Sequence, residues 1–179
     1  RIRGGAGTDT IYGNDGNDKM VAGSGADEIY GHDGDDNLYG EGGPDKLFGG
    51  AGDDFMSSSA DNDQLFGGAG NDTLNASSGN DDIEGEEGAD KINAGSGDDI
   101  AYGGDGTDEI SGGAGVDNLY GGNDVDNIYG EAGDDDLFVL RSHGRVLCVG
   151  RSGRKPEGHA QRDQRCAAPA PTGLVRVCV

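Results

Sequence analysis

Carboxylates recur at one fixed spacing along most of this chain. An aspartate stands at every ninth residue from Asp9 to Asp135, fifteen in all, without insertion or deletion. Each follows a short glycine-rich stretch, as in Gly4-Gly5-Ala6-Gly7 before Thr8 and Asp9. Carboxylate oxygens and the carbonyl oxygens of glycine turns are hard ligands of the kind that Ca²⁺ takes in sets of six to eight. The spacing therefore predicts a series of divalent-cation sites rather than one catalytic centre.

The aspartates belong to a nonapeptide that fills residues 4–138 fifteen times. Its first, second and fourth positions are mostly glycine, which permits backbone angles with φ above zero and therefore tight turns. The fourth position departs from glycine only at Asp61 and Asp124, and aspartate tolerates the left-handed region better than most residues. The eighth position is Ile, Leu or Met in every repeat except one, where Ala101 stands. Ile2 falls in the same register, as the end of an earlier, truncated repeat.

Positions seven to nine form a polar–aliphatic–variable triplet. Such a triplet predicts a very short strand with one inward side chain. A helix is excluded because apolar residues nine apart draw no stripe at a period of 3.6 residues. One aliphatic side chain in nine cannot form a core alone, but stacked coils can join these side chains into a narrow spine. The sequence therefore predicts an all-β fold, a parallel β-roll or β-solenoid, over residues 1–140.

A second period, of eighteen residues, indicates two repeats per coil. The ninth position is aromatic in seven of the eight odd-numbered repeats, with Glu84 as the exception, but in only two even-numbered repeats. Odd repeats should then stack in one sheet and even repeats in the other, over roughly 36 Å at ~4.8 Å per strand. The aromatic column either stabilises strand stacking or forms a docking face. The non-glycine residues of the first position also fall in odd repeats: Ala22, Ser58, Ala76 and Ala94.

Stacking places the position-six carboxylates in two columns, one along each side of the roll. Neighbouring carboxylates in a column would repel by several kcal/mol at an effective dielectric of ~20. A divalent cation between successive coils removes this conflict, and about thirteen such junctions would bring a charge of roughly +26. Mg²⁺ fits less well because it demands strict octahedral geometry, and zinc would want His or Cys, of which the repeats hold only His32.

We therefore expect several Ca²⁺ ions, held by these aspartates together with backbone carbonyls of the glycine turns. The predicted ligands are Asp9, Asp18, Asp27, Asp36, Asp45, Asp54, Asp72, Asp90, Asp99, Asp108, Asp117, Asp126 and Asp135. Weaker sites are expected at Asp63 and Asp81, because their repeats lack three and two of the turn glycines, respectively.

The charge distribution excludes several classes of function. Residues 1–140 carry 33 acidic and 5 basic side chains, a net charge of −28, so they will not bind nucleic acids or anionic membranes by charge. A chain with 38 glycines and no Trp buries little apolar surface, so without a cation it should be disordered. No apolar run is long enough to span a membrane. Motifs of metalloproteases, phosphate-binding loops, nucleophile elbows and EF-hands are missing, and we expect no catalytic activity in this chain.

Residues 141–179 have a different composition. They hold 8 basic and 2 acidic side chains, and all three cysteines of the chain lie among them. They show no period, so we expect a basic, unstructured tail, either native or read in a shifted frame. A zinc site from Cys148, His159, Cys166 and Cys178 is possible by residue type, but the spacings fit no common zinc pattern.

The nonapeptide resembles the RTX (repeats-in-toxin) or hemolysin-type calcium-binding repeats of bacterial toxins, serralysin-like metalloproteases, lipases and alginate epimerases. The pattern Gly-Gly-x-Gly-x-Asp carries the resemblance over residues 4–138, about three quarters of the chain. The resemblance implies a parallel β-roll, aspartate ligation of Ca²⁺, export by a type I secretion system, and repeats that fold only outside the calcium-poor cytosol. Calcium binding by a folding and stabilising module of a secreted, extracellular bacterial protein is the expected function.

Two alternatives stay open. The chain could be the non-catalytic C-terminal part of a secreted toxin, protease, lipase or epimerase whose active domain lies upstream. It could instead be part of an extracellular adhesin that uses calcium for rigidity. The first residue is Arg1 rather than Met and no signal peptide follows it, which suggests a fragment or a processed piece.

Overall fold

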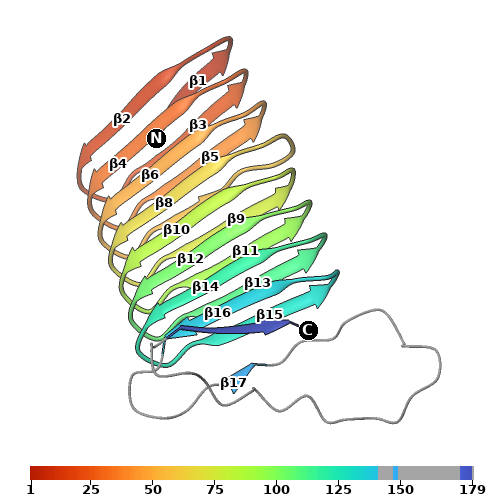
Figure 1. Ribbon diagram of the computed structural model, residues 1–179. Coiled ribbons are helices and arrows are strands. Elements are labelled where there is room, and N and C mark those ends of the chain that lie inside the picture. The colour runs from red at the N-terminus through yellow and green to blue at the C-terminus, as the bar shows by residue number, and fades with distance from the viewer. Residues whose placement is uncertain (141–146, 149–173, 179) are drawn as a thin grey trace, which may run out of the picture.

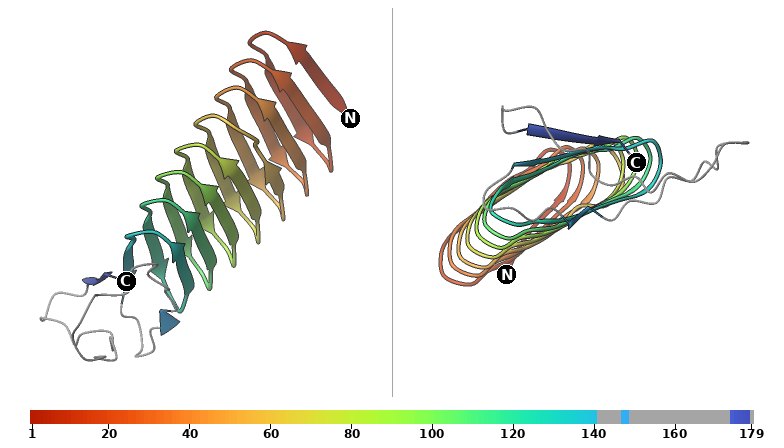
Figure 2. Two further views of the ribbon diagram at one scale, coloured as in Figure 1. Left: turned by 90° about the vertical axis from the view of Figure 1, so that its right-hand side faces the viewer. Right: turned by 60° about the horizontal axis from the view of Figure 1, so that its bottom comes forward.

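The computed structural model describes residues 1–140, 147–148 and 174–178, and every regular element in these ranges is a strand. The strands form two nine-stranded sheets that face each other, and the chain alternates between them along the whole roll (Figures 1 and 2). The predicted β-solenoid with two nonapeptides per coil is confirmed. Within the described residues, no helix with the length and apolarity of a membrane span occurs.

The first sheet contains the odd-numbered strands and the second sheet the even-numbered strands. The first sheet consists of β1 (Ile2–Ala6), β3 (Lys19–Ser24), β5 (Asn37–Gly42), β7 (Phe55–Ser57), β9 (Thr73–Ser78), β11 (Lys91–Ser96), β13 (Glu109–Ala114), β15 (Asn127–Ala132) and β17 (Leu147–Cys148). The second sheet consists of β2 (Thr10–Asp15), β4 (Glu28–Asp33), β6 (Lys46–Ala51), β8 (Gln64–Ala69), β10 (Asp82–Glu87), β12 (Ile100–Asp105), β14 (Asn118–Asn123), β16 (Asp136–Leu140) and β18 (Leu174–Cys178). All neighbours run parallel except β18, which is antiparallel to β16.

Strands pair with the equivalent strand eighteen residues further on. Ile11 lies beside Ile29, and Ile29 lies beside Leu47, so odd repeats follow one another in the second sheet. Ile2 pairs with Met20, which confirms that Ile2 lies in register with the repeats. The period of eighteen read from the aromatic residues is therefore the true coil length.

The strands are longer than predicted. Most contain six residues: positions seven to nine of one repeat and positions one to three of the next. Positions eight and one both point inward, so the prediction of a three-residue strand with one inward side chain was wrong. Glycines at positions one and two suggested a turn, but parallel pairing with the equivalent strand keeps both positions inside the strand. Only β7 among the strands of residues 1–138 is as short as predicted, and it stops at Ser57 where the glycine pattern fails.

A spine of aliphatic side chains forms the core, as predicted. Every position-eight side chain from Ile11 to Leu137 is buried, and Ile11 is the most exposed of them at 5%. Ala22, Ala76 and Ala94 fill the neighbouring inward position one in the first sheet and are fully buried. Burial of each large aliphatic side chain stabilises the fold by roughly 1.5–3 kcal/mol, so this one-residue-wide core is continuous but thin.

The turn positions use their glycines in two different ways. Positions two and four do adopt positive φ, except at Ser59, and this includes non-glycine residues such as His32 (φ 77°) and Asp61 (φ 85°). The glycines at position one do not adopt positive φ, so that part of the prediction was wrong. Position one needs glycine for space: a Cβ on Gly103 would lie less than 3.0 Å from a carboxylate oxygen of Asp108 and from a backbone carbonyl oxygen.

Aromatic rings stack along the outer face of the second sheet. Tyr12, Tyr30, Phe48 and Phe66 form one ladder with centroid separations of 4.8–5.1 Å. A shorter ladder joins Tyr102 to Tyr120 and Tyr120 to Phe138, at 4.6 and 4.4 Å. Glu84 separates the two ladders, since its Cα pairs with Phe66 on one side and with Tyr102 on the other. The rings therefore contribute to the stacking of coils, one of the two roles expected of them.

Candidate metal centre

The position-six aspartates line the inside of the turns. Each one follows a turn and directly precedes a strand, and from Asp27 on its side chain reaches back toward the preceding coil. Thirteen of the fifteen are buried, from Asp27 to Asp135, at 6% exposure or less. Asp9 and Asp18, in the first coil, are half-buried. The aspartates of odd repeats form one column along one edge of the roll. The aspartates of even repeats form a second column along the opposite edge.

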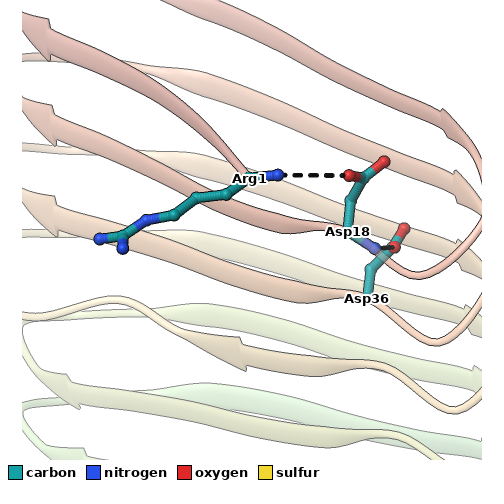
Figure 3. A network of polar contacts seen from close by, with 3 residues as sticks. All are labelled: Arg1, Asp18 and Asp36. Carbon is teal, nitrogen blue, oxygen red and sulfur yellow. Dashed lines mark hydrogen bonds and ion pairs between the residues drawn. The ribbon is translucent and has the colours of Figure 1, made fainter.

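A hydrogen-bond ladder connects the aspartates within each column. The backbone N–H of each aspartate donates to Oδ1 of the aspartate eighteen residues further on, at 2.7–3.1 Å, in thirteen successive pairs. Figure 3 shows the pair in which Asp18 donates to Asp36, with the amino group of Arg1 3.8 Å from the carboxylate of Asp18. One carboxylate oxygen of each residue is thus fixed by the preceding coil. These thirteen pairs match the number of inter-coil junctions predicted.

The other carboxylate oxygen lacks a partner in the protein. Oδ2 is buried and accepts no hydrogen bond in Asp9, Asp27, Asp36, Asp45, Asp54, Asp63, Asp72, Asp81, Asp90, Asp99, Asp108 and Asp117. Burying an ionised carboxylate oxygen without a partner is strongly unfavourable, and repetition along a column adds mutual repulsion. A bound cation would remove both costs.

Backbone carbonyls could complete such a site. The carbonyls of positions three and six already accept turn hydrogen bonds, as when Gly7 N–H donates to Ser24 at 2.8 Å and Glu28 N–H donates to Asp9 at 2.9 Å. The position-four carbonyl accepts none of the turn hydrogen bonds in residues 4–138. Oδ2 atoms and position-four carbonyls are hard oxygen donors, which suit Ca²⁺. In the described part of the chain no three His, Cys, Asp or Glu side chains converge, so any ion there must draw on the backbone.

Burial shifts the acidity of these carboxyls upward. Desolvation raises the pKa of Asp72 and Asp108 to about 7, and nearby aspartates add to the rise while backbone N–H donors oppose it. The pKa values of Asp45, Asp54, Asp81 and Asp117 rise to about 6 for the same reasons. Without a cation, the folded columns therefore hold protons that an unfolded chain would release at pH 7.

Acid should partly replace calcium. The pKa of these aspartates is higher in the folded state (about 6–7) than the ordinary value of 3.8, so the folded state binds more protons between these limits. Stability of the calcium-free fold should accordingly be greatest near pH 4 and should be lost as pH rises through 6 to 7. Far-UV circular dichroism of calcium-depleted protein should show β-structure growing as pH falls from 8 to 4.5. A β signal that weakens on acidification would contradict this linkage.

Repeats seven and nine keep the column geometry despite their missing glycines. Asp63 and Asp81 are buried, and each accepts the N–H of the preceding coil at 2.8 Å. In repeat seven a serine hydroxyl lies near the position-six carboxylate. The Ser58 hydroxyl donates to the Ala76 carbonyl at 3.0 Å, and it also lies close enough to Asp63 to lower the pKa of that carboxyl. The weaker binding predicted at Asp63 and Asp81 stays a prediction.

A second ladder, at position five, was not foreseen. The side-chain oxygens of Asn17, Asp35, Asp53 and Asn71 each accept the backbone N–H eighteen residues further on, at 2.8–3.2 Å. A shorter run of the same kind starts at Asn62 on the other edge. These side chains are exposed. Here the N–H of the later coil donates to the side chain of the earlier coil, whereas in the aspartate columns the N–H of the earlier coil donates to the side chain of the later one. The sequence did hold the signal, since Asn or Asp fills position five in successive repeats of one parity.

Predictions for the tail concern residues that are mostly outside the described part of the chain. The expected unstructured segment 141–179 is described only in the strands β17 and β18. His159 and Cys166, needed for the zinc site considered above, lie outside the described residues.

Comparison with protein families identifies the repeat. A family model described as the RTX calcium-binding nonapeptide repeat matches four times, over residues 1–29, 30–65, 66–101 and 102–137. A search of curated proteins gave no match to the chain. The four matches follow one another through the whole stack of buried carboxylates described above. The chain therefore belongs to the family of RTX calcium-binding nonapeptide repeats.

Proposed function

We propose that this chain is a calcium-dependent folding and stabilising module of a secreted bacterial protein. One observation carries the proposal above all: twelve aspartates each bury a carboxylate oxygen that no group in the described part of the protein satisfies. A protein that must hold such oxygens in its interior needs a cation for each junction. Membership of a calcium-binding repeat family gives the cation its identity.

The chain's own residues would prepare each site. The N–H of one aspartate fixes Oδ1 of the next, which leaves Oδ2 oriented inward, as between Asp54 and Asp72 at 2.8 Å. Position four has positive φ, which rotates the peptide group of that residue. The position-four carbonyl therefore stays out of the turn hydrogen bonds. When bound, calcium supplies the positive charge that buried carboxylates require. Each aspartate contributes to two junctions, so binding at one junction should favour the next.

Coupling of binding to folding supports a role outside the cell. A ligand that binds only the folded state stabilises that state by mass action, and extracellular calcium modules commonly bind at about 10⁻⁴–10⁻³ M. At the far lower calcium levels of a cytosol, a segment with a net charge of −28 would stay expanded and therefore competent for export. We propose export by a type I system and attachment to an upstream functional domain, with no catalysis in the repeats themselves.

Thermal unfolding should separate calcium from a general salt effect. With rising calcium the unfolding temperature should climb steadily, because binding is linked to the folded state. Equal concentrations of magnesium should give a far smaller rise, since Mg²⁺ sheds its water reluctantly and wants octahedral geometry. The measurement is differential scanning calorimetry of the full chain in calcium, magnesium and chelator. Identical unfolding temperatures in all three would rule the proposed function out.

A further inference from the structure

The outer face of the second sheet exposes more aromatic surface than any other described surface of the roll. Tyr12 on β2 is 52% exposed, and Tyr102 and Ile100, both on β12, are 39% and 38% exposed. Side chains at positions seven, nine and two form three columns on this face, and each column runs along the stack of strands. An exposed aromatic column between two mostly polar columns commonly marks an interaction surface.

Two residues on this face break the pattern of their columns. Lys46 is the one lysine or arginine in the even-numbered strands β2 to β16 of the second sheet, and it forms no ion pair with another described residue. Glu84 replaces an aromatic ring, and Asp82 lies on the same strand two residues before it. Lys46 belongs to β6 and the two acids belong to β10, so they lie at equal distances on either side of β8.

From this symmetry we infer that two copies of the chain pair face to face through their second sheets, around a two-fold axis that runs along β8. With such an axis, each column of one copy faces the same column of the other copy. The order of the coils is reversed between the two copies. Lys46 then faces Asp82 of the second copy, with Glu84 one column away, and the same contact forms twice. Charge complementarity of this kind fixes register and orientation at an interface.

Side-chain sizes fit the same register. In the position-two column, Asn14 opposes Gly122, His32 opposes Gly104, and Glu86 opposes Gly50, so each side chain meets a glycine. Gly68, on β8, meets itself at the axis. A shift by one coil toward the N-terminus would place His32 against Glu86, and a shift in either direction would leave Gly50 opposite another glycine.

The other two columns contribute self-complementary contacts. At position nine, Phe66 meets Phe66, Tyr30 meets Tyr102, and Tyr12 meets Tyr120. The interrupting Glu84 falls opposite Phe48 of the other copy and one column away from its Lys46, so it does not meet another carboxylate. Both departures from the column pattern thus have one explanation in this arrangement.

The area suffices for a stable dimer. Seven strands of each copy overlap, with a spacing of about 4.8 Å and a length of about 20 Å each. They would bury roughly 670 Å² per copy and roughly 1,300 Å² in total. This lies at the lower end of the standard size for specific interfaces. A net charge of −28 on each repeat region would oppose pairing, so the dimer should require the calcium-loaded state.

Sedimentation equilibrium of the full chain in saturating calcium tests the inference. We expect a dimer of twice the chain mass of 18.2 kDa. Lys46→Asp and Asp82→Lys should each weaken the dimer at least about tenfold, and the double variant should restore it. Lys91→Asp is the matched control, because Lys91 lies on the first sheet and its exposed ion pair with Glu109 is outside the interface; it should leave the dimer unchanged.

The outcomes are separable from those of the calcium function. Circular dichroism in the same buffer reports whether the coils are folded. Folded protein that stays monomeric at high concentration would overturn the dimer and leave the calcium function standing. A dimer that ignores both single charge reversals, or that the double variant does not restore, would overturn the assigned register. As a second test, Gln64→Cys, with the native cysteines changed to Ser, should be joined by a short bis-maleimide, whereas Thr73→Cys on the first sheet should not.

Discussion

Replacing Gly103 by alanine should destabilise the folded protein far more than the same replacement at Gly112. Both glycines stand at position one and point inward, but in different sheets. A Cβ on Gly103 would overlap the backbone carbonyl oxygen of Gly121 in the next coil, and backbone in a tight stack cannot move aside. The three atoms nearest to a Cβ on Gly112 all belong to the side chain of Asp117, which can move further than backbone can. We expect a loss of about 1–3 kcal/mol at Gly103 and less than about 1 kcal/mol at Gly112.

The chain has already accepted alanine in the permissive sheet. Ala22, Ala76 and Ala94 all lie in the first sheet, and the carboxylate ladder continues through their repeats, as at Asp27 and Asp99. Chemical denaturation of both variants in saturating calcium would measure the two losses. Equal losses would show that crowding at position one does not explain why alanine appears in only one sheet.

Replacing Asp36 by alanine should raise the calcium concentration needed for folding, whereas Asp63→Ala should have little effect. Removal of the Asp36 carboxylate deprives the Asp18 N–H of its acceptor at 2.7 Å and takes a charged ligand from two junctions. We expect a cost of about 2–3 kcal/mol there. Repeat seven lacks its turn glycines, and the Ser58 hydroxyl already stabilises the carboxylate of Asp63, so fewer calcium contacts are at stake.

A calcium titration followed by circular dichroism would rank these two variants. Asp72→Ala provides a reference at a similar depth in the stack, because Asp72 belongs to the coil that also contains Asp63. It should shift the midpoint at least as far as Asp36→Ala. Midpoint shifts of equal size for Asp63 and Asp72 would reject the idea that repeat seven binds calcium weakly.

The sequence predicted the fold well because one physical requirement repeats without interruption. A single aliphatic residue in nine can be buried only by stacking, so the position of the spine followed from Ile11, Ile29 and their equivalents. The aromatic residues at every eighteenth position, such as Tyr12 and Tyr30, revealed which repeats are neighbours. Both inferences depend on period alone, which a sequence displays directly.

Local backbone geometry was harder to read from the sequence. Glycine suits a positive φ and a crowded extended strand equally well, so Gly103 resembled a turn residue although it lies inside a strand. In these carboxylates Oδ1 accepts a hydrogen bond and Oδ2 has no partner. This difference depends on the distance between successive coils. The ladder through Asn17 and Asp35 depends on the same distance, which no residue type encodes by itself.

The central claim is that buried carboxylates stacked in columns require divalent cations to fold. Far-UV circular dichroism of the full chain at pH 7, first in chelator and then through a calcium titration, tests it most directly. The account predicts a largely unfolded spectrum in chelator and one cooperative rise of β signal with calcium, reversed when chelator is restored. A calcium-depleted chain that already shows the full β spectrum, and does not change on adding millimolar calcium, would contradict it.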